Sequence, residues 1–120
     1  MDSEPMIASW PASVLSPNSR EHWTKRAKFK KSQRLEWATL ARASRMTAPR
    51  EGKVDVRLEF IPTDRRPRDA DNMLASCKAG LDGLADALGV NDSRFRITFD
   101  MGEPVKGGAC VRVWVGRGVQ

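Results

Sequence analysis

The chain has 120 residues, a length typical of one domain that buries its own core without a disulfide scaffold. Its composition, 40% hydrophobic and 30% charged, excludes a disordered or fibrous chain, and no apolar run approaches the ~20 residues that cross a bilayer. The net charge of +6 comes entirely from residues 1–53, which carry 11 basic and 5 acidic side chains, whereas residues 54–120 carry 10 of each. The polar N-terminus is no secretory signal and the two cysteines are isolated, so we expect a cytoplasmic protein that does not enter a membrane.

The N-terminal half predicts a strand followed by a long basic helix. The short apolar segment from Met6 to Trp10 precedes two prolines, which favours an edge strand leading into a loop. Residues 20–44 lack proline and glycine and are rich in helix formers, so we expect one helix there. Most of the excess positive charge lies in this stretch, at Arg20, Lys25, Arg26, Lys28, Lys30, Lys31 and Arg34. Such a helix either binds a polyanion, with nucleic acid as the first candidate, or is simply a solvated surface.

The C-terminal half predicts three strands and a second helix. Apolar and polar residues alternate over Val54–Phe60, Phe95–Met101 and Cys110–Val115, the pattern of strands with one buried face. Between the first two, apolar residues recur at steps of three and four, which predicts a helix from Asp71, its N-cap, to Leu88. Gly89 follows as a natural stop.

The order of these elements predicts a small α+β domain. We expect a mostly antiparallel sheet of three to four strands packed with two helices. Gly80 and Gly83 weaken the second helix, so its stability must come from packing. The chain contains no internal boundary, and residues 1–120 are expected to form one domain with flexible ends at 1–5 and 116–120.

Charged residues gather where the second helix begins. Asp69 and Asp71 lie two residues apart, directly after the arginine-rich segment 65–68. If the strands on either side of this helix pair, Asp92 joins them at the same end of the sheet. Three carboxylates would form an all-oxygen site that suits Mg²⁺ or Mn²⁺, and the arginines would suit an anion such as a phosphodiester.

The same helix supplies a lysine. At about 100° per residue, Asp71, Lys78 and Asp82 fall within roughly 20° of one another, so Lys78 could reach a phosphate bound at a metal. Taken singly, each feature has a simpler explanation: Asp71 caps a helix, Lys78 pairs with Asp82 on the surface, and Asp92 belongs to a turn. Their convergence favours a metal site that binds a phosphodiester.

The sequence resembles the RusA family of Holliday-junction endonucleases, small enzymes that are common in phages and prophages, over roughly residues 14–115. The segments that carry the resemblance are Arg65–Asn72, Lys78–Leu84, Asn91–Ser93, Leu15–Trp23 and Lys106–Gly108. The resemblance implies a RusA-like fold and a homodimer in the cytoplasm of a bacterial or phage-infected cell. Each subunit would use Mg²⁺, with Mn²⁺ as a substitute, to cut one strand of a four-way DNA junction.

On that basis the metal ligands are Asp69, Asp71 and Asp92, and Lys78 is the catalytic lysine. Lys78 follows the second aspartate by seven residues where better-known family members have four, which moves it about one helical turn along the same face. The usual Asp-Asp turn reads Asn91-Asp92 here, so Asp92 is the expected ligand.

The predicted activity is therefore hydrolysis of phosphodiester bonds in branched DNA. The metal would activate a water, and Lys78 would stabilise the negative charge on the phosphate. Trp23 is the best candidate to stack on a base. The residues expected to contact DNA phosphates are Arg65, Arg66, Arg68, Lys25, Arg26, Lys28, Lys30 and Lys31. Two alternatives stay open: a DNA-binding module without catalysis, and a branched-DNA nuclease without four-way preference.

Overall fold

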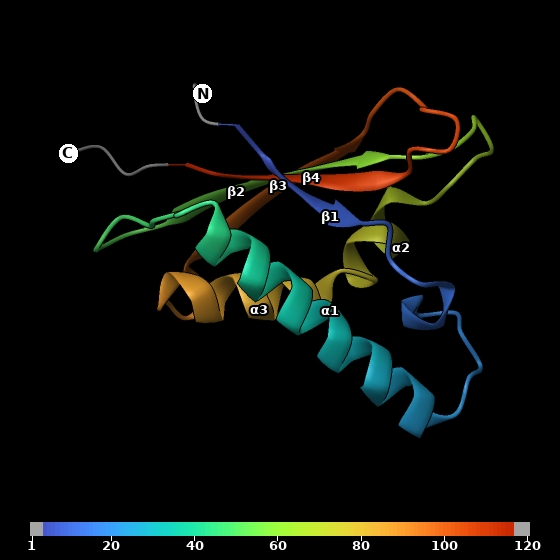
Figure 1. Ribbon diagram of the computed structural model, residues 1–120, viewed down its shortest axis with the longest axis horizontal. Helices are drawn as coiled ribbons and strands as arrows, with labels where there is room; N and C mark the ends of the chain where they lie inside the picture. Colours follow the sequence, from blue (N-terminus) through green and yellow to red (C-terminus); the bar gives the residue numbers. More distant parts are fainter. Residues whose placement is uncertain (1–3, 117–120) are drawn as a thin grey trace.

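The computed structural model describes residues 4–116, which form a sheet with helices on one face (Figure 1). The predicted flexible ends, residues 1–5 and 116–120, fall mostly outside the described residues. Along the chain the elements are β1 (Met6–Ser9), the 3-10 turn η1 (Ser13–Leu15), α1 (Trp23–Ala43), β2 (Val54–Ile61), α2 (Ala70–Ala75), α3 (Lys78–Leu88), the 3-10 turn η2 (Asp92–Arg94), β3 (Phe95–Met101) and β4 (Cys110–Val115).

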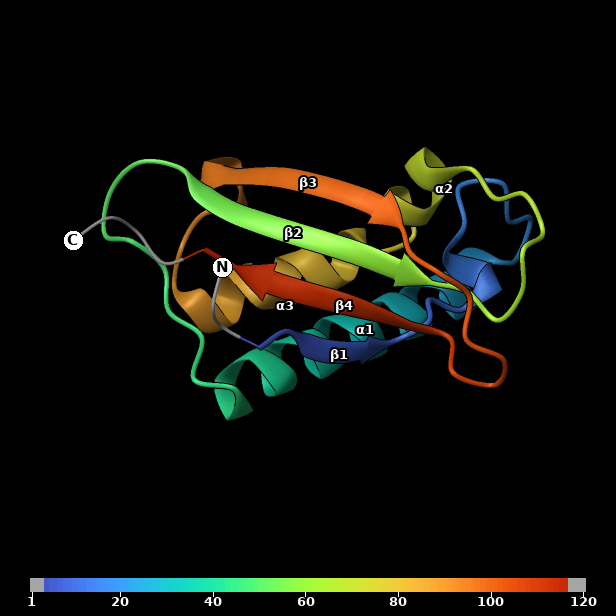
Figure 2. The ribbon, with the colours of Figure 1, turned by 90° about the horizontal axis from the view of Figure 1, so that it is seen from above.

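The four strands form one mixed sheet in the order β1-β4-β2-β3 (Figure 2). β4 pairs antiparallel with both β1 and β2, whereas β2 and β3 run parallel, with Val54 opposite Phe95 and Phe60 opposite Met101. The parallel pairing follows from the connection between β2 and β3. The helices of this connection carry the chain back to the end of the sheet where β2 began, so β3 runs in the same direction as β2. The α+β class is confirmed, and two of the three strand pairings are antiparallel.

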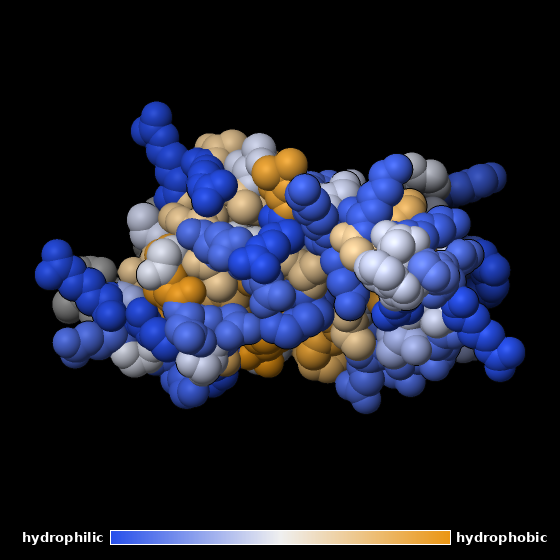
Figure 3. Space-filling view, turned by 90° about the horizontal axis from the view of Figure 1, so that it is seen from below, coloured by the Kyte–Doolittle hydropathy of each residue, from blue (hydrophilic) through white to orange (hydrophobic). Residues whose placement is uncertain are grey.

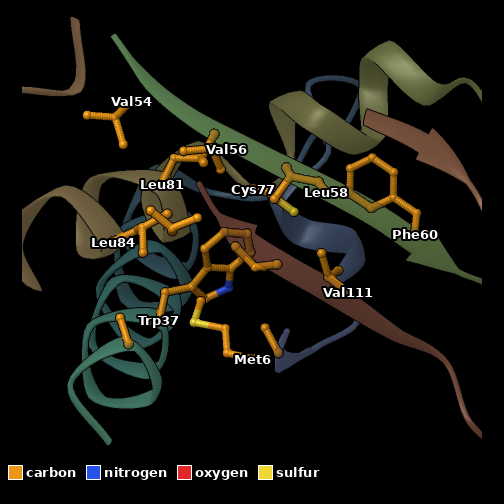
Figure 4. Close-up of a cluster of buried hydrophobic side chains, with 14 residues drawn as sticks. Met6, Trp37, Val54, Val56, Leu58, Phe60, Cys77, Leu81, Leu84 and Val111 are labelled. Carbon is orange, nitrogen blue, oxygen red and sulfur yellow. The ribbon is translucent and has the colours of Figure 1, made fainter. Parts of the chain in front are cut away.

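The core lies between the sheet and the helices, as the alternating strand patterns predicted. Val56 and Leu58 of β2 and Val113 of β4 are fully buried, and Trp37 of α1 fills the space between them and α3 (Figure 4). The opposite face of the sheet is open and carries the cross-strand ion pairs Arg96–Asp55 at 2.6 Å, Arg112–Glu59 at 3.1 Å and Arg57–Asp100 at 3.7 Å.

Two glycines let α3 pack directly against α1. A Cβ at Gly83 would collide with the backbone carbonyl of Arg34, and one at Gly80 would collide with the ring of Trp37. The close approach that only glycine allows offsets the low helix propensity of these residues. The helix is closely packed along the side that carries these glycines, in line with the expectation that its stability comes from packing.

The prediction of one helix from Asp71 to Leu88 is wrong in one respect. The segment forms two helices, α2 and α3, which are separated by a break at Ser76 and Cys77. In a continuous helix the carbonyl of Ser76 would accept from the N–H of Gly80. Here the side-chain amide of Gln33 is inserted between these two groups, donating to the first and accepting from the second, each at 2.9 Å. Side chains that enter the backbone ladder are a known cause of helix kinks.

The apolar pattern gave no sign of this break, because residues on both sides of it still face the core. Cys77 and Leu81 are buried and Leu74 packs against them. The N-cap also differs from the prediction: it is Asp69, whose Oδ1 accepts from the N–H of Asp71 at 2.9 Å. Gly89 ends α3 in the left-handed conformation, at φ 68°, as predicted.

The N-terminal half of α1 diverges from the plane of the sheet (Figure 1). All side chains of residues 23–32 are exposed except that of Arg26, which is half-buried. His22 caps the helix, with its Nδ1 accepting from the N–H of Thr24 at 3.2 Å. Among the described residues, no helix combines the length and apolar character needed to span a membrane.

Candidate functional site

A groove of about 730 Å³ runs between α1, the α2–α3 pair and the start of β3. Apolar side chains that include Leu74, Phe95 and Ile97 line part of it. The charged side chains that line it are Arg26, Lys30, Asp71, Lys78, Asp82 and Asp92. On the helix-covered face as a whole, hydrophobic surface appears only in small areas between hydrophilic side chains (Figure 3).

Lys78 is the centre of the charged cluster in this groove. It is the first residue of α3, and its Nζ donates to Oδ1 of Asp82 at 2.8 Å and to Oδ2 of Asp92 at 2.7 Å. These hydrogen bonds, that to Asp82 first, raise the pKa of Lys78, and the contact with Lys78 lowers the pKa of Asp92. The lysine is therefore held as a cation between the side chains of Asp82 and Asp92.

The two aspartates at the start of α2 have different environments. Asp71 is exposed in the first turn of the helix and lines the groove. Asp69 caps the helix, where its Oδ1 accepts from the N–H groups of Asp71 and Asn72, and it does not line the groove. The structure thus brings Asp71, Lys78 and Asp92 to one groove and leaves Asp69 at its cap.

The expectation that these aspartates meet at one end of the sheet was wrong. β2 and β3 do pair, but in parallel, so Asp92 precedes β3 at one end whereas Asp69 and Asp71 follow β2 at the other. The groove joins Asp71 and Asp92 along the α2–α3 pair instead. Within residues 4–116, no three Asp, Glu, His or Cys side chains lie close enough to hold one metal ion together.

The three arginines of segment 65–68 all form ion pairs with carboxylates outside the groove. Arg65 pairs with Glu103 at 3.0 Å, and Arg66 and Arg68 pair with Asp64 at 3.1 and 3.0 Å. The hydrogen bonds from Arg66 hold the pKa of Asp64 far below its usual range. None of the three arginines lines the groove, although Arg65 and Arg66 are exposed enough to exchange these weak ion pairs for a phosphate.

Arg68 has a more structural position than its two neighbours. Its side chain is 19% exposed, its guanidinium lies 5.6 Å from the centre of the Trp10 ring, and it donates to the backbone carbonyls of Asp64 and Arg66 at 3.0 Å. It therefore holds the loop in shape, and direct contact with DNA would need this network to open.

The predicted cations of α1 divide in the same way. Lys28, Lys30 and Lys31 are exposed, and Lys30 lines the groove. Lys25 is exposed and pairs with Glu21 at 3.6 Å. Arg26 instead fixes the segment before the helix, because its Nη1 donates to the carbonyls of Val14 and Ser16 at 3.2 Å and of Ser19 at 3.5 Å.

Trp23, the first residue of α1, has 71% of its surface accessible, which suits the stacking role predicted for it.

Two arginines close to Asp92 in sequence have partners outside the groove. Arg94 donates to the carbonyls of Pro49 and Gly52, and Arg96 pairs with Asp55.

Asp82 and Gln33 line the groove but were not among the predicted site residues. The sequence suggested Asp82 only as a surface partner of Lys78, through their i,i+4 spacing. Gln33 is 7% exposed and lines the groove from α1. Nothing in the sequence marked Gln33, because a glutamine in a basic helix is an ordinary surface residue until its neighbours are known.

Comparison with known proteins adds a relative but no activity. No family model matches the chain. A relative from Xylella fastidiosa (strain Temecula1), described as an uncharacterized protein, is 46% identical over 89 residues. The matched segment is 72% of this chain and 58% of the relative, so the chain spans less than two thirds of that protein's length.

Proposed function

We propose that the protein is a metal-dependent endodeoxyribonuclease of the RusA type that cleaves branched DNA, with four-way junctions as its preferred substrate. One observation carries the proposal: Asp71, Lys78 and Asp92 line a single groove beside the exposed basic half of α1. Carboxylates next to a lysine suit a metal and a scissile phosphate, and the lysines of α1 suit the flanking phosphates.

The donor set fits Mg²⁺ in its chemistry. The groove offers the oxygen ligands of three aspartates, Asp71, Asp82 and Asp92. Proteins usually hold Mg²⁺ by one or two carboxylates together with waters and substrate phosphates. Asp71 and Asp92 are the proposed ligands. Asp69, which the resemblance implies as a third, caps α2 through its Oδ1 and does not line the groove. When bound, the ion would supply an activated water and neutralise charge on the phosphate.

The other residues of the groove would bind and orient the DNA. Lys78 would stabilise the charge that builds on the phosphate, since its ammonium is already fixed in the groove. Lys28, Lys30 and Lys31 would contact the backbone without regard to sequence, and Trp23 would stack on an unpaired base. Two symmetric cuts need two such sites, so we propose a homodimer that acts in the cytoplasm of a bacterial or phage-infected cell.

The test is cleavage of a labelled four-way junction beside a linear duplex and a three-way junction of the same sequence. We expect paired cuts in the four-way junction with Mg²⁺ or Mn²⁺, and intact DNA in a chelator. Equal cleavage of all branched forms would favour the nuclease without four-way preference. Cleavage that continues unchanged in the chelator would refute the metal-dependent mechanism.

The non-catalytic reading draws on a different observation. Asp69 caps α2 through its Oδ1, and Lys78 already has two carboxylate partners in Asp82 and Asp92. A DNA-binding module of this kind would hold the junction equally well with Mg²⁺ and in a chelator and would never cut it, which the same assay would reveal.

A further inference from the structure

Gln33 makes two buried hydrogen bonds to the backbone at the break between α2 and α3. Its Nε2 donates to the carbonyl of Ser76 and its Oε1 accepts from the N–H of Gly80, both at 2.9 Å. Only one orientation of the amide satisfies both partners, because a carbonyl needs a donor and an N–H needs an acceptor. The side chain is 7% exposed, so water competes little for these bonds.

The two backbone groups bracket Lys78. Ser76 lies two residues before it and Gly80 two residues after it, and these groups would bond to each other in an unbroken helix. By taking both, Gln33 holds the helix open and fixes where α3 begins. Lys78 is the first residue of α3, and from this position its Nζ reaches Asp82 and Asp92.

We propose that Gln33 is a positioning residue that sets Lys78 between Asp82 and Asp92. Its effect on cleavage rests on the proposed function, whereas its effect on Lys78 does not. Gln33 lies on α1, which also carries the exposed lysines, so it links the orientation of Lys78 to the helix proposed to bind DNA.

The main test is Gln33→Met, which keeps the length of the side chain and removes both hydrogen bonds. The carbonyl of Ser76 and the N–H of Gly80 can then bond to each other, so the variant has a route to a folded, unbroken helix. A second variant, Gln33→Glu, keeps the acceptor for Gly80 and places an acceptor opposite the carbonyl of Ser76. The matched control is Arg34→Gln, which breaks the Arg34–Asp86 contact between the same two helices.

The first readout is the ¹⁵N NMR signal of the Lys78 ammonium group, recorded at low temperature and mildly acidic pH so that its exchange with water is slow. We expect this signal in the wild type and in Arg34→Gln, and its loss or a large shift in both Gln33 variants. The second is single-turnover cleavage of a four-way junction, which should fall about 10- to 100-fold in the Gln33 variants, with little change in DNA binding.

An unchanged Lys78 signal in Gln33→Met would overturn the proposal, and if that variant does not fold, an unchanged signal in Gln33→Glu would do the same. A lost signal in a protein whose wild type does not cleave DNA would uphold the positioning role and refute the nuclease function. A lost signal with full cleavage would uphold the positioning of Lys78 and overturn its importance for the reaction.

Discussion

At the scale of single residues, the groove separates groups that the sequence treats alike. Asp69 and Asp71 are two residues apart, yet one is turned to the backbone as a cap and the other lines the groove. The position of Lys78 also matters. Its i,i+4 pair with Asp82 alone would be an ordinary surface contact, but in the groove it contacts Asp92 as well. The roles of these side chains are therefore best separated by single substitutions.

Asp71→Asn should abolish metal-dependent cleavage and leave junction binding equal or tighter, because it removes a proposed ligand and a charge that repels phosphate. Asp69→Asn is the matched variant: asparagine caps helices about as well as aspartate, so α2 should keep its stability and cleavage should fall much less. Cleavage and binding assays, with circular dichroism to verify folding, check both. Wild-type cleavage by Asp71→Asn would remove Asp71 from the metal site.

Lys78→Ala should lower the single-turnover cleavage rate by about 10²-fold while changing binding little, because its charge matters most when charge develops on the phosphate. Lys106→Ala, which removes an exposed lysine from the β3–β4 loop, is the control and should cleave normally. A rate for Lys78→Ala within a few-fold of wild type would mean that Lys78 serves only as a surface ion pair.

At the scale of elements, α1 has two different environments along its length. Its C-terminal half packs Trp37 and Ala41 into the core. Its N-terminal half is exposed, and within residues 4–116 Lys25 is the one lysine of this half that forms an ion pair. α3 is fitted to α1 through glycines rather than through an apolar stripe alone. One prediction follows for each helix.

Changing Lys28, Lys30 and Lys31 together to Ala should weaken binding to any DNA and reduce its salt dependence by up to ~0.9 log-log slope units per lost phosphate contact. In the control triple variant, Arg42, Arg50 and Lys53 are changed to Ala. This removes the same charge from the C-terminal end of α1 and the loop that follows it. Binding measured across salt concentrations compares the two. Equal slopes in both variants would show that the exposed half of α1 does not face DNA.

Gly83→Ala should destabilise the protein although alanine favours helices by ~1 kcal/mol, since its Cβ would meet the backbone carbonyl of Arg34, which cannot move aside like a side chain. Overpacking of this kind costs ~1–3 kcal/mol, so after the gain in helix propensity we expect a net loss of up to about 2 kcal/mol in the free energy of unfolding. Urea denaturation measures it. Asp86→Ala on the same helix should have a much smaller effect, and a stabilised Gly83→Ala would contradict the packing described here.

At the scale of the whole molecule, charge is balanced over the sheet and unbalanced over α1. Ion pairs on the open sheet face and in the loop after β2 lower the pKa values of Asp55 and Asp64. Contacts with Arg34 and Lys78 on the helices do the same for Asp86 and Asp92. Among residues 4–116, most lysines and arginines without an ion pair lie on α1 or on the segments next to it, which gives this part of the surface a positive charge suited to a polyanion.

The lowered carboxyl pKa values predict the direction of acid sensitivity. A group whose pKa is lower in the folded state stabilises the fold above its unfolded pKa, and this contribution is lost as pH falls through the folded value. We therefore expect stability to decrease below about pH 4, near the unfolded pKa of aspartate. The effect should shrink in high salt, because the ion pairs are exposed. Thermal melts from pH 7 to pH 2 at low and high salt test this.

The sequence by itself determined the α+β class, the strand positions and the exposed basic helix. Hydrophobic periodicity and the residues that begin or end helices are local properties of the chain, so they can be recognised without the fold. It also identified Asp71, Lys78 and Asp92, which the structure brings to one groove. Only the tertiary structure decided that β3 runs parallel to β2, that the second helix breaks, and that Asp69 faces a cap instead of the groove. The parallel pairing and the helix break depend on contacts between distant segments, which no local pattern encodes. The cap is a local contact, but the sequence offers two neighbouring aspartates for it and does not choose between them.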